Sequence, residues 1–441
     1  MDRRTLFGSA LEQGSYHARG GTPWYIFTDA VSGTTMAIDE RCAFQHVLLL
    51  GGSGSGKTNV MNQIVAQARA LPRADEDVLF IFDTKGDYIS HDNFLRRGDY
   101  ILGNSRQFRD RSMVWNVFDE VLADGADYRD VEANAHEIAS ELFRDRGSQT
   151  QPFFADAARD IFASTLILYV RRAAERTAEW QSRLNNYDLL QLLQGDSKRL
   201  MKHFELYPDM RGLFSYVGDG TSNQALGVFG ELRSMLNDCF QGIFAMRPAS
   251  EAQSFSVRRA IRRKGGRAIF LEYDLSLGET MIPMYRLLCD LTLKEALSSN
   301  ASGRCLLFLD ELKLLPKVSH LEDALNFGRS KQVSVVAGLQ SVSQIYSIYG
   351  EDVGATILGG FGSVIAMRTP DYPTREYITK LFGPNIVAYR YHTLSNTPLD
   401  REREGSVVEH WQIQALRTGQ AIVGLASQSE PYLFNFQYGT L

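Results

Sequence analysis

The residues with the clearest chemical potential form the run Gly-Gly-Ser-Gly-Ser-Gly-Lys-Thr at positions 51–58. This spacing is that of a P-loop, in which glycines let backbone N–H groups turn inward onto phosphate oxygens. Lys57 can reach the β- and γ-phosphates, and Thr58 can hold Mg²⁺. An apolar run at 47–50 precedes the loop and a helix-compatible run follows it, so the helix dipole adds to phosphate binding. The sequence thus predicts a site for ATP and Mg²⁺, made of Gly51, Ser53, Gly54, Ser55, Gly56, Lys57 and Thr58.

A second motif is an apolar run at 306–309 that ends in Asp310 and Glu311. As a Walker B element, Asp310 would organise Mg²⁺ and Glu311 would position the attacking water. Alone the pattern is common, since two acids after a buried strand can simply cap a helix. Downstream of a complete P-loop it is specific, and the second acid favours a hydrolytic motor over a small-molecule kinase or a GTPase.

Three polar residues at or near the ends of expected strands are further candidates. Asp83 either supports the metal shell or belongs to a tight strand-to-helix turn that uses Gly86, and the sequence does not separate these alternatives. Gln340 follows an apolar run at 333–339, where a polar side chain can sense the γ-phosphate. Arg329 is either an arginine finger for a neighbouring subunit or a solvated cation at a helix end, which is the commoner case.

Composition bounds the class of protein. At 441 residues the chain holds two domains, or one large domain with an insertion. The net charge of −5 confines any nucleic-acid binding to a local surface. Four scattered cysteines argue against a zinc site and a disulfide framework, and for a reducing compartment. The most apolar window, 161–170, is shorter than the ~20 residues that a membrane span needs.

The expected fold is α/β, with a mainly parallel central sheet and an inserted all-α domain. Helical stripes dominate between the second and third expected strands, so we predict an all-α insertion at 120–255 within a nucleotide-binding domain of 1–119 and 256–441. Asn186 is expected to cap a helix that ends near 193. The charged run 400–405 is expected to be a solvated loop. Buried strands are predicted at 47–50, 78–82, 268–273, 306–309, 333–339 and 364–367, with a closing pair near 420–425 and 432–436.

A cluster of basic residues lies just before the strand expected at 268–273. The spacing of its arginines predicts that they share one side of a helix, where they could track the phosphates of DNA in a ring channel. The alternative, which the net charge slightly favours, is a solvated helix face paired with acids such as Glu251. The candidate nucleic-acid contacts are Arg258, Arg259, Arg262 and Arg263.

The motifs, taken together in their order, resemble those of conjugative coupling proteins, the ATPases of type IV secretion systems that link a relaxosome to the transport channel. The resemblance covers roughly residues 40–385 and continues more loosely to the end. Of these motifs, only the P-loop is specific when taken by itself. Besides the P-loop and Walker B segments, the resemblance rests on the runs 46–51, 83–87, 98–104, 115–120, 152–159, 328–329, 340–345 and 349–350.

This resemblance implies a RecA-like nucleotide domain carrying a membrane-distal all-α domain, related to FtsK-type motors and assembled as a hexameric ring with ATP between subunits. It puts Arg329 at the position of the arginine that acts in trans, and Gln340 at that of the γ-phosphate sensor. The implied function is ATP-driven DNA translocation that recruits a relaxosome to a type IV secretion channel in conjugation. The implied partners are DNA, relaxase and relaxosome accessory proteins, secretion components and further copies of the chain.

Two rival functions stay open at this point. One is an adaptor that recruits a relaxase or an effector protein through the all-α domain, and the other is a HerA/FtsK-like motor in DNA processing or phage defence. Members of the resembled family normally carry N-terminal transmembrane helices, and this sequence has none. We therefore expect a cytoplasmic protein at the cytoplasmic face of the bacterial inner membrane, held there by a missing anchor or by a membrane-bound partner.

Overall fold

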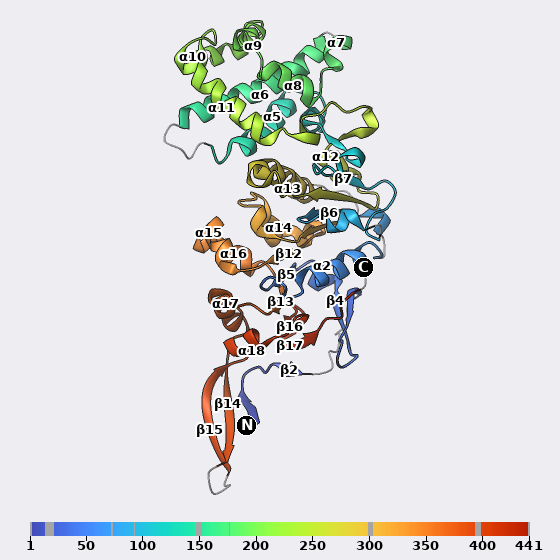
Figure 1. Cartoon of the computed structure of the whole chain (residues 1–441), viewed down its shortest axis with the longest axis vertical. Coiled ribbons are helices and arrows are strands. Elements are labelled where there is room, and N and C mark those ends of the chain that lie inside the picture. Colours follow the sequence, from blue (N-terminus) through green and yellow to red (C-terminus); the bar gives the residue numbers. More distant parts are fainter. Residues whose placement is uncertain are drawn as a thin grey trace.

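The protein is built around one large twisted sheet (Figure 1). A computed structural model describes residues 2–13, 22–71, 74–91, 93–146, 152–175, 177–298, 303–392 and 398–439. In these residues the sheet has the order β2-β17-β16-β13-β5-β12-β11-β6-β10-β7. The strands are β2 (Glu12–Gln13), β5 (Val47–Leu50), β6 (Val78–Asp83), β7 (Tyr100–Leu102), β10 (Arg267–Glu272), β11 (Cys305–Leu309), β12 (Val333–Leu339), β13 (Ser363–Met367), β16 (Gln420–Gly424) and β17 (Tyr432–Asn435).

The strand directions confirm the predicted fold class. From β13 through β5, β12, β11, β6 and β10 to β7 every neighbouring pair is parallel, whereas β16 pairs antiparallel with both β13 and β17. The six apolar runs predicted as buried strands form the centre of this sheet, and their ends agree to within one residue. The carboxyl ends of these parallel strands therefore meet at one edge, where α/β proteins place their ligands.

Side chains alternate between two covered faces along each central strand. In β11, Leu306 and Phe308 pack on the face covered by α2 (Lys57–Ala68), and Leu307 and Leu309 pack on the opposite face. All four are at most 1% exposed. Burying one such side chain contributes roughly 1.5–3 kcal/mol. Because β11 is covered on both faces, all of its side chains are buried, and its sequence is accordingly apolar throughout.

A helical segment forms one end of the elongated molecule (Figure 1). Two short strands, β8 (Val114–Trp115) and β9 (Ser254–Phe255), pair in parallel and bring the two ends of this segment together. The main helices of this end are α4 (Val117–Val121), α5 (Tyr128–Phe143), α6 (Pro152–Glu175), α7 (Thr177–Gln181), α8 (Asn186–Leu193), α9 (Ser197–Phe204), α10 (Phe214–Val217) and α11 (Asn223–Cys239).

The cap of α8 was predicted one residue too late. The side chain of Asn185 accepts from Asp188 N, so Asn185 is the N-cap. Asn186 is fully buried instead: its amide donates to the carbonyl oxygens of Trp115 and Phe244, and its oxygen accepts from Val117 N. Asn186 thus ties the helical segment to β8.

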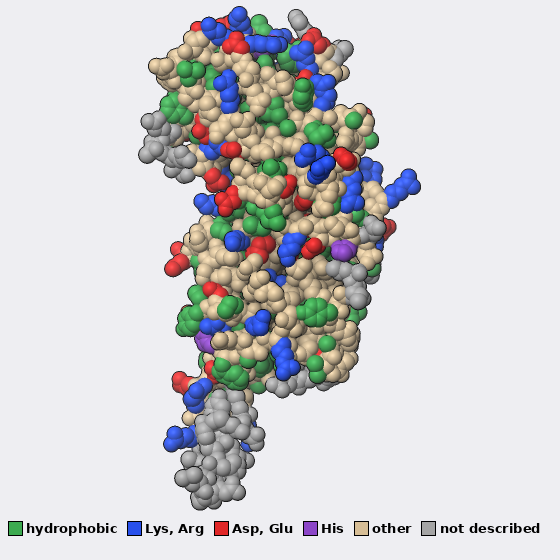
Figure 2. Space-filling view, viewed as in Figure 1, with side chains coloured by type: hydrophobic (Ala, Val, Ile, Leu, Met, Phe, Trp, Pro, Cys, Tyr) green, Lys and Arg blue, Asp and Glu red, His purple; other side chains and the backbone are tan. Residues whose placement is uncertain are grey.

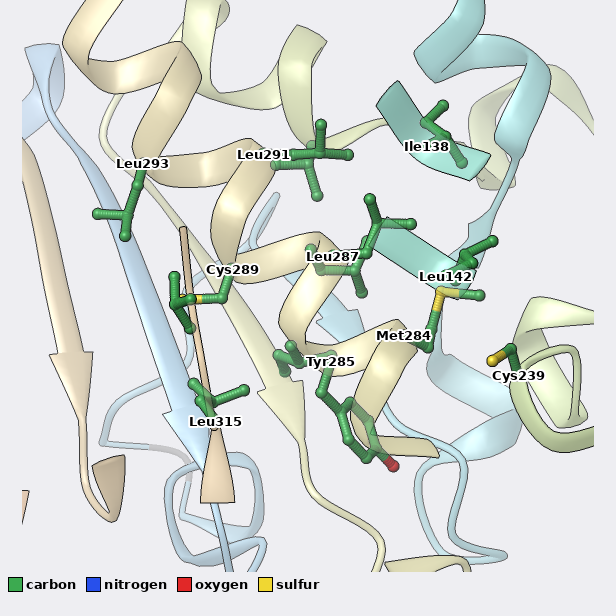
Figure 3. Close-up of a cluster of buried hydrophobic side chains, with 14 of the residues drawn as sticks. Ile138, Leu142, Cys239, Met284, Tyr285, Leu287, Cys289, Leu291, Leu293 and Leu315 are labelled. Atoms are coloured by element: carbon green, nitrogen blue, oxygen red, sulfur yellow. The ribbon is translucent and has the colours of Figure 1, made fainter. Parts of the chain in front are cut away.

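The helix α13 (Ile282–Ser298) lies between the helical segment and the sheet, and its buried side chains pack against both (Figure 3). Met284 and Leu287 lie toward Leu142 of α5, while Cys289 lies toward Leu315, which follows β11. One hydrophobic cluster therefore continues from the helical segment through α13 to one face of the sheet. Such continuity couples the position of the helices to that of the sheet.

A three-stranded arm of β1 (Asp2–Phe7), β14 (Pro384–His392) and β15 (Pro398–Ser406) projects from the other end of the molecule (Figure 1). The prediction of a loop at 400–405 was wrong, because these residues belong to β15 and pair with β14. The remaining α-helices of the described residues are α1 (Glu40–Ala43), α3 (Asp87–Ser90), α12 (Val257–Arg263), α14 (Leu321–Phe327), α15 (Val342–Tyr349), α16 (Glu351–Gly359), α17 (Tyr372–Phe382) and α18 (His410–Ala415).

Candidate nucleotide-binding site

The predicted P-loop connects the carboxyl end of β5 to the first turn of α2. Gly54 and Gly56 have φ values of 70° and 112°, which favour glycine. A Cβ placed on Gly56 would lie 3.2 Å from the backbone nitrogen of Gly419. That nitrogen donates to the carbonyl of Ser55 at 2.9 Å. The segment before β16 therefore packs directly against the loop and holds its turn.

The ammonium of Lys57 lies over the loop. Its Nζ donates to the carbonyl oxygens of Gly51, at 2.5 Å, and of Gly52, at 3.3 Å. Burial lowers the pKa of Lys57, and the negative charges of Glu311 and Asp310 oppose this shift. An anionic ligand in the loop would favour the charged ammonium in the same way, so a phosphate is a fitting partner for this lysine.

Glu311 and Gln340 are brought together at the ends of β11 and β12. The amide nitrogen of Gln340 donates to Glu311 Oε2 at 2.7 Å, while Oε1 is buried and has no hydrogen-bond partner within the described chain. Burial raises the pKa of Glu311, against the effects of Gln340 and Lys57. Gln340 thus fixes the orientation of the carboxylate through one of its two oxygens.

Asp310 is buried beside the same cavity and receives a hydrogen bond from the hydroxyl of Thr84, at 3.2 Å. Burial raises its pKa, while the Thr84 hydrogen bond and the charges of Lys85 and Lys57 oppose that shift. Asp310 and Thr58 both line the cavity and offer oxygen atoms. This donor set fits Mg²⁺, which takes one or two protein oxygens together with phosphate oxygens and water.

The cavity has a volume of about 510 Å³. It contains every predicted nucleotide-binding residue except Gly51, whose carbonyl accepts from Lys57 as described, and it also contains Asp310, Glu311 and Gln340. The P-loop run 52–58, Asn59 and residues from several strand ends form its walls. The lining residues that the sequence analysis did not single out are Asn59, Thr84, Lys85, Leu275, Leu314, Thr418 and Tyr438.

Asp83 serves the turn rather than the cavity wall. Its carboxylate accepts from four backbone nitrogens, those of Lys85, Asp87, Tyr88 and Ile89, at 3.0–3.3 Å. Burial raises its pKa to about 6. Of the two alternatives, these contacts favour the tight strand-to-helix turn.

Arg329 lies at the opposite edge of the sheet from the cavity. It is exposed in a short 3₁₀ turn, Gly328–Lys331, that leads into β12, whereas Gln340 follows the carboxyl end of the same strand. With a rise of roughly 3.3 Å per residue, the strand separates the two ends by on the order of 20 Å. The structure therefore does not bring Arg329 to the nucleotide cavity of its own chain.

The arginine cluster on α12 does not form the single basic face that was predicted. Arg258 is only 4% exposed and contacts Glu137, Asp124 and Asn134. A buried arginine held by acids is not available to a DNA phosphate, so its assignment as a DNA contact was wrong.

The other three arginines of α12 reach the surface to different extents. Arg262 pairs with Glu295 at 2.6 Å and with Asp124, and Arg259 pairs with Asp119 at 3.0 Å. Arg263 is exposed. On the face shown in Figure 2, Lys and Arg side chains lie interspersed with acidic ones. For Arg258, Arg259 and Arg262 the pairing with acids is thus the better interpretation.

Fold and site together define the class of the protein. A P-loop after the strand β5, two acids after β11 and a polar side chain after β12 share one cavity at the carboxyl edge of a mainly parallel sheet, as in P-loop proteins with a RecA-like fold. Comparison with known families shows to which family within this class the chain belongs. The chain belongs to the family described as the type IV secretion-system coupling protein DNA-binding domain, which matches residues 31–430.

Individual proteins and solved structures are also similar to this chain. Coupling protein TraD of Escherichia coli (strain K12) is 22% identical over 392 residues, which are 84% of this chain and 50% of TraD. The unbound, monoclinic form of the bacterial conjugative coupling protein TrwBdeltaN70 superposes with a TM-score of 0.69 at 22% identity, covering 99% of this chain and 95% of TrwBdeltaN70. VirB4 of Thermoanaerobacter pseudethanolicus superposes with a TM-score of 0.54 at 14% identity, covering 98% of this chain and 99% of VirB4.

The chain spans about half the length of the curated relative that it matches. No helix in the described part of the chain combines the length and apolar character that a bilayer crossing requires.

Proposed function

We propose that this protein is an ATP-hydrolysing DNA translocase that recruits DNA to a type IV secretion channel during conjugation. The observation that carries the proposal is the single cavity in which Lys57, Asp310, Glu311 and Gln340 meet, on the fold of a coupling-protein family. A structure of TrwB, a plasmid coupling protein, in complex with ADP and Mg²⁺ supports it: its TM-score is 0.68 at 22% identity, covering 100% of this chain and 96% of TrwB. Relaxase and relaxosome proteins, together with secretion components at the cytoplasmic face of the inner membrane, are the proposed partners.

In this proposal each cavity residue has a distinct role. Lys57 and the P-loop N–H groups bind the β- and γ-phosphates, and Thr58 and Asp310 hold Mg²⁺, which supplies charge neutralisation at the phosphates. Glu311 accepts a hydrogen bond from the attacking water, while Gln340 orients the carboxylate through Oε2. Hydrolysis then depends on positioning and electrostatics rather than on a covalent intermediate.

We further propose that residues 120–255 act as an all-α domain inserted into a nucleotide-binding domain of 1–119 and 256–441. The pairing of β8 with β9 supports this division, since it closes the helical segment at both ends. Glu120 strengthens the junction: it is fully buried and accepts from the indole of Trp115, the hydroxyl of Ser256 and two backbone nitrogens of α12. Movement of one part would then be transmitted to the other.

The motor function predicts that DNA stimulates ATP hydrolysis. The expected result is a several-fold rise in turnover when DNA is added to the purified protein at low salt, with the stimulation falling as salt competes for the phosphates. The measurement is steady-state phosphate release with single-stranded DNA, double-stranded DNA and no DNA. Heparin at matched charge serves as the control for unspecific polyanion effects. Equal turnover in all of these conditions would contradict the motor.

That negative result would favour the second candidate, an adaptor that binds relaxase or effector proteins. The helical segment exposes several large side chains that such a partner could contact, among them Tyr187 at 46%, Leu206 at 58% and Leu226 at 60%.

Arg329 leads to a prediction about assembly. Because it lies at the far edge of its own sheet, a catalytic role requires the cavity of a neighbouring subunit, as in the proposed hexamer. The variant Arg329→Ala is expected to lower kcat by about 10³-fold, the lower end of the range for arginine fingers, with ATP affinity unchanged. Lys331→Ala, which removes an exposed cation from the same turn, is the matched control.

Mixing two inactive variants tests the trans assignment directly. A ring that contains both Lys57→Ala and Arg329→Ala subunits has some interfaces with an intact lysine on one side and an intact arginine on the other. The mixture should therefore regain part of the turnover that each variant lacks alone. A mixture as inactive as its components, or a loss of ATP binding in Arg329→Ala, would contradict a role in trans.

A further inference from the structure

One exposed aromatic ring lines the candidate nucleotide cavity, and nothing above assigns it a role. Tyr438 is 66% exposed, and it shares the cavity with Lys57, Thr58 and Thr418. Because the ring lines the cavity and most of it is open, it can contact a planar group bound there.

The backbone around Tyr438 is held firmly on the helix that follows the P-loop. The side chains of Asn59 and Gln63 both donate to the carbonyl of Gln437, at 2.9 and 2.8 Å, and the backbone nitrogen of Gly439 donates to Asn59 Oδ1 at 3.0 Å. These contacts come from the first two turns of α2. The ring is thus presented by a fixed backbone rather than by a free tail.

The ring itself lies against the segment that packs on the P-loop. A Cβ placed on Gly419 would be 3.7 Å from Tyr438 Cε2. Gly419 also donates to the carbonyl of Ser55 and accepts from the nitrogen of Phe436. One edge of the ring therefore lies beside Gly419, which itself packs on the P-loop, while most of the side chain stays open.

The order of the strands in the sheet indicates which end of a bound nucleotide would reach the ring of Tyr438. The strands β12, β11 and β6 lie on one side of β5 and bring Gln340, Glu311, Asp310 and Lys85 to the cavity. The strands β13, β16 and β17 lie on the other side of β5, and the segments next to β16 and β17 bring Thr418 and Tyr438. A nucleoside triphosphate with its terminal phosphate at the catalytic acids would extend its base toward the second side.

Resting on the proposed ATP site, we propose that Tyr438 is the platform on which the nucleobase stacks, so that the site accepts adenine and guanine nucleotides alike. Stacking uses the π-face that every base has, and it does not read hydrogen-bonding edges. The neighbouring Gly419 adds no side chain that could distinguish the two purines. Tyr438 is therefore a binding residue whose contribution is independent of the phosphate contacts.

The test compares nucleotides with a ligand that has no base. Tyr438→Ala is expected to weaken binding of both Mg·ADP and Mg·GDP by about 10-fold, which corresponds to ~1.4 kcal/mol, within the usual range for one stacked base. Binding of Mg·tripolyphosphate should not change. Tyr438→Trp should retain nucleotide affinity, and Tyr372→Ala, which removes an exposed tyrosine on α17, is the control. Calorimetric titration measures the affinity of the full-length wild type and of the three variants for each of the three ligands. Melting curves verify that the variants fold.

The possible outcomes separate this inference from the proposed function. If the wild type binds nucleotide, Lys57→Ala does not, and Tyr438→Ala binds as the wild type does, the stacking role is overturned and the ATP site stands. An equal loss of affinity for nucleotide and tripolyphosphate in Tyr438→Ala would also overturn it, since the ring would then act through the P-loop. A wild type that binds neither nucleotide overturns the proposed function and the stacking role together.

Discussion

Replacing Lys57 by alanine is expected to lower ATP turnover by at least about 100-fold, a typical cost of removing one charged donor from a phosphoryl-transfer site. Within the described residues the ammonium donates hydrogen bonds to the carbonyl oxygens of Gly51 and Gly52, both in its own loop. Its removal therefore costs little folding free energy, and the loss should appear in nucleotide binding and hydrolysis. The measurement combines ATP titration, steady-state phosphate release and a thermal melt of the variant.

The control for Lys57→Ala must remove a positive charge without entering the cavity. Lys380 meets this requirement, because its side chain is 75% exposed on α17 and pairs only at the surface with Glu376. Lys380→Ala should bind and hydrolyse ATP as the wild type does, since an exposed ion pair is screened by solvent and lies outside the cavity. Normal hydrolysis by Lys57→Ala would show that turnover arises at another site.

The parts of this site that could be predicted from the sequence are those in which neighbouring residues act together. The P-loop is such a case, since its lysine and glycines work within eight consecutive positions, and β12 is another, because five of its seven residues are apolar and all seven are buried between the two faces. For these segments local chemistry and tertiary structure require the same residues.

Residues whose role depends on a distant partner could not be predicted. Tyr438 reaches the cavity because Asn59 holds Gln437, which lies 378 positions away in the sequence. Likewise, the spacing of Arg258 and Arg262 shows that they share a helix face, yet it does not show that acids of α5 and α13 cover that face. The strand pairing at 400–405 was missed for the same reason, since its partner β14 determines its conformation.

Glu311→Gln should separate hydrolysis from binding. The substitution keeps the size of the side chain but removes the negative charge that accepts a proton from water, so we expect turnover to fall by about 10²–10³-fold with ATP binding retained. Asp310, Thr58 and Lys57 stay in place to hold Mg²⁺ and phosphate. Asp310→Asn is the matched comparison, because it should weaken Mg²⁺-dependent binding itself. Single-turnover hydrolysis and ATP titration distinguish the two variants, and equal losses of binding would contradict a catalytic role for Glu311.

The pH dependence of turnover is a second measurement that tests the role of Glu311 with the variant Glu311→Gln. Burial raises the pKa of Glu311, and the residue can take a proton from water only when it is deprotonated. Wild-type turnover should therefore decline on acidification at a higher pH than an exposed glutamate would cause. In Glu311→Gln the small residual turnover should lack this decline, because the titrating carboxylate is gone. If both proteins lost activity at the same pH, another group would be responsible, and Glu311 would be left with a structural part beside Gln340.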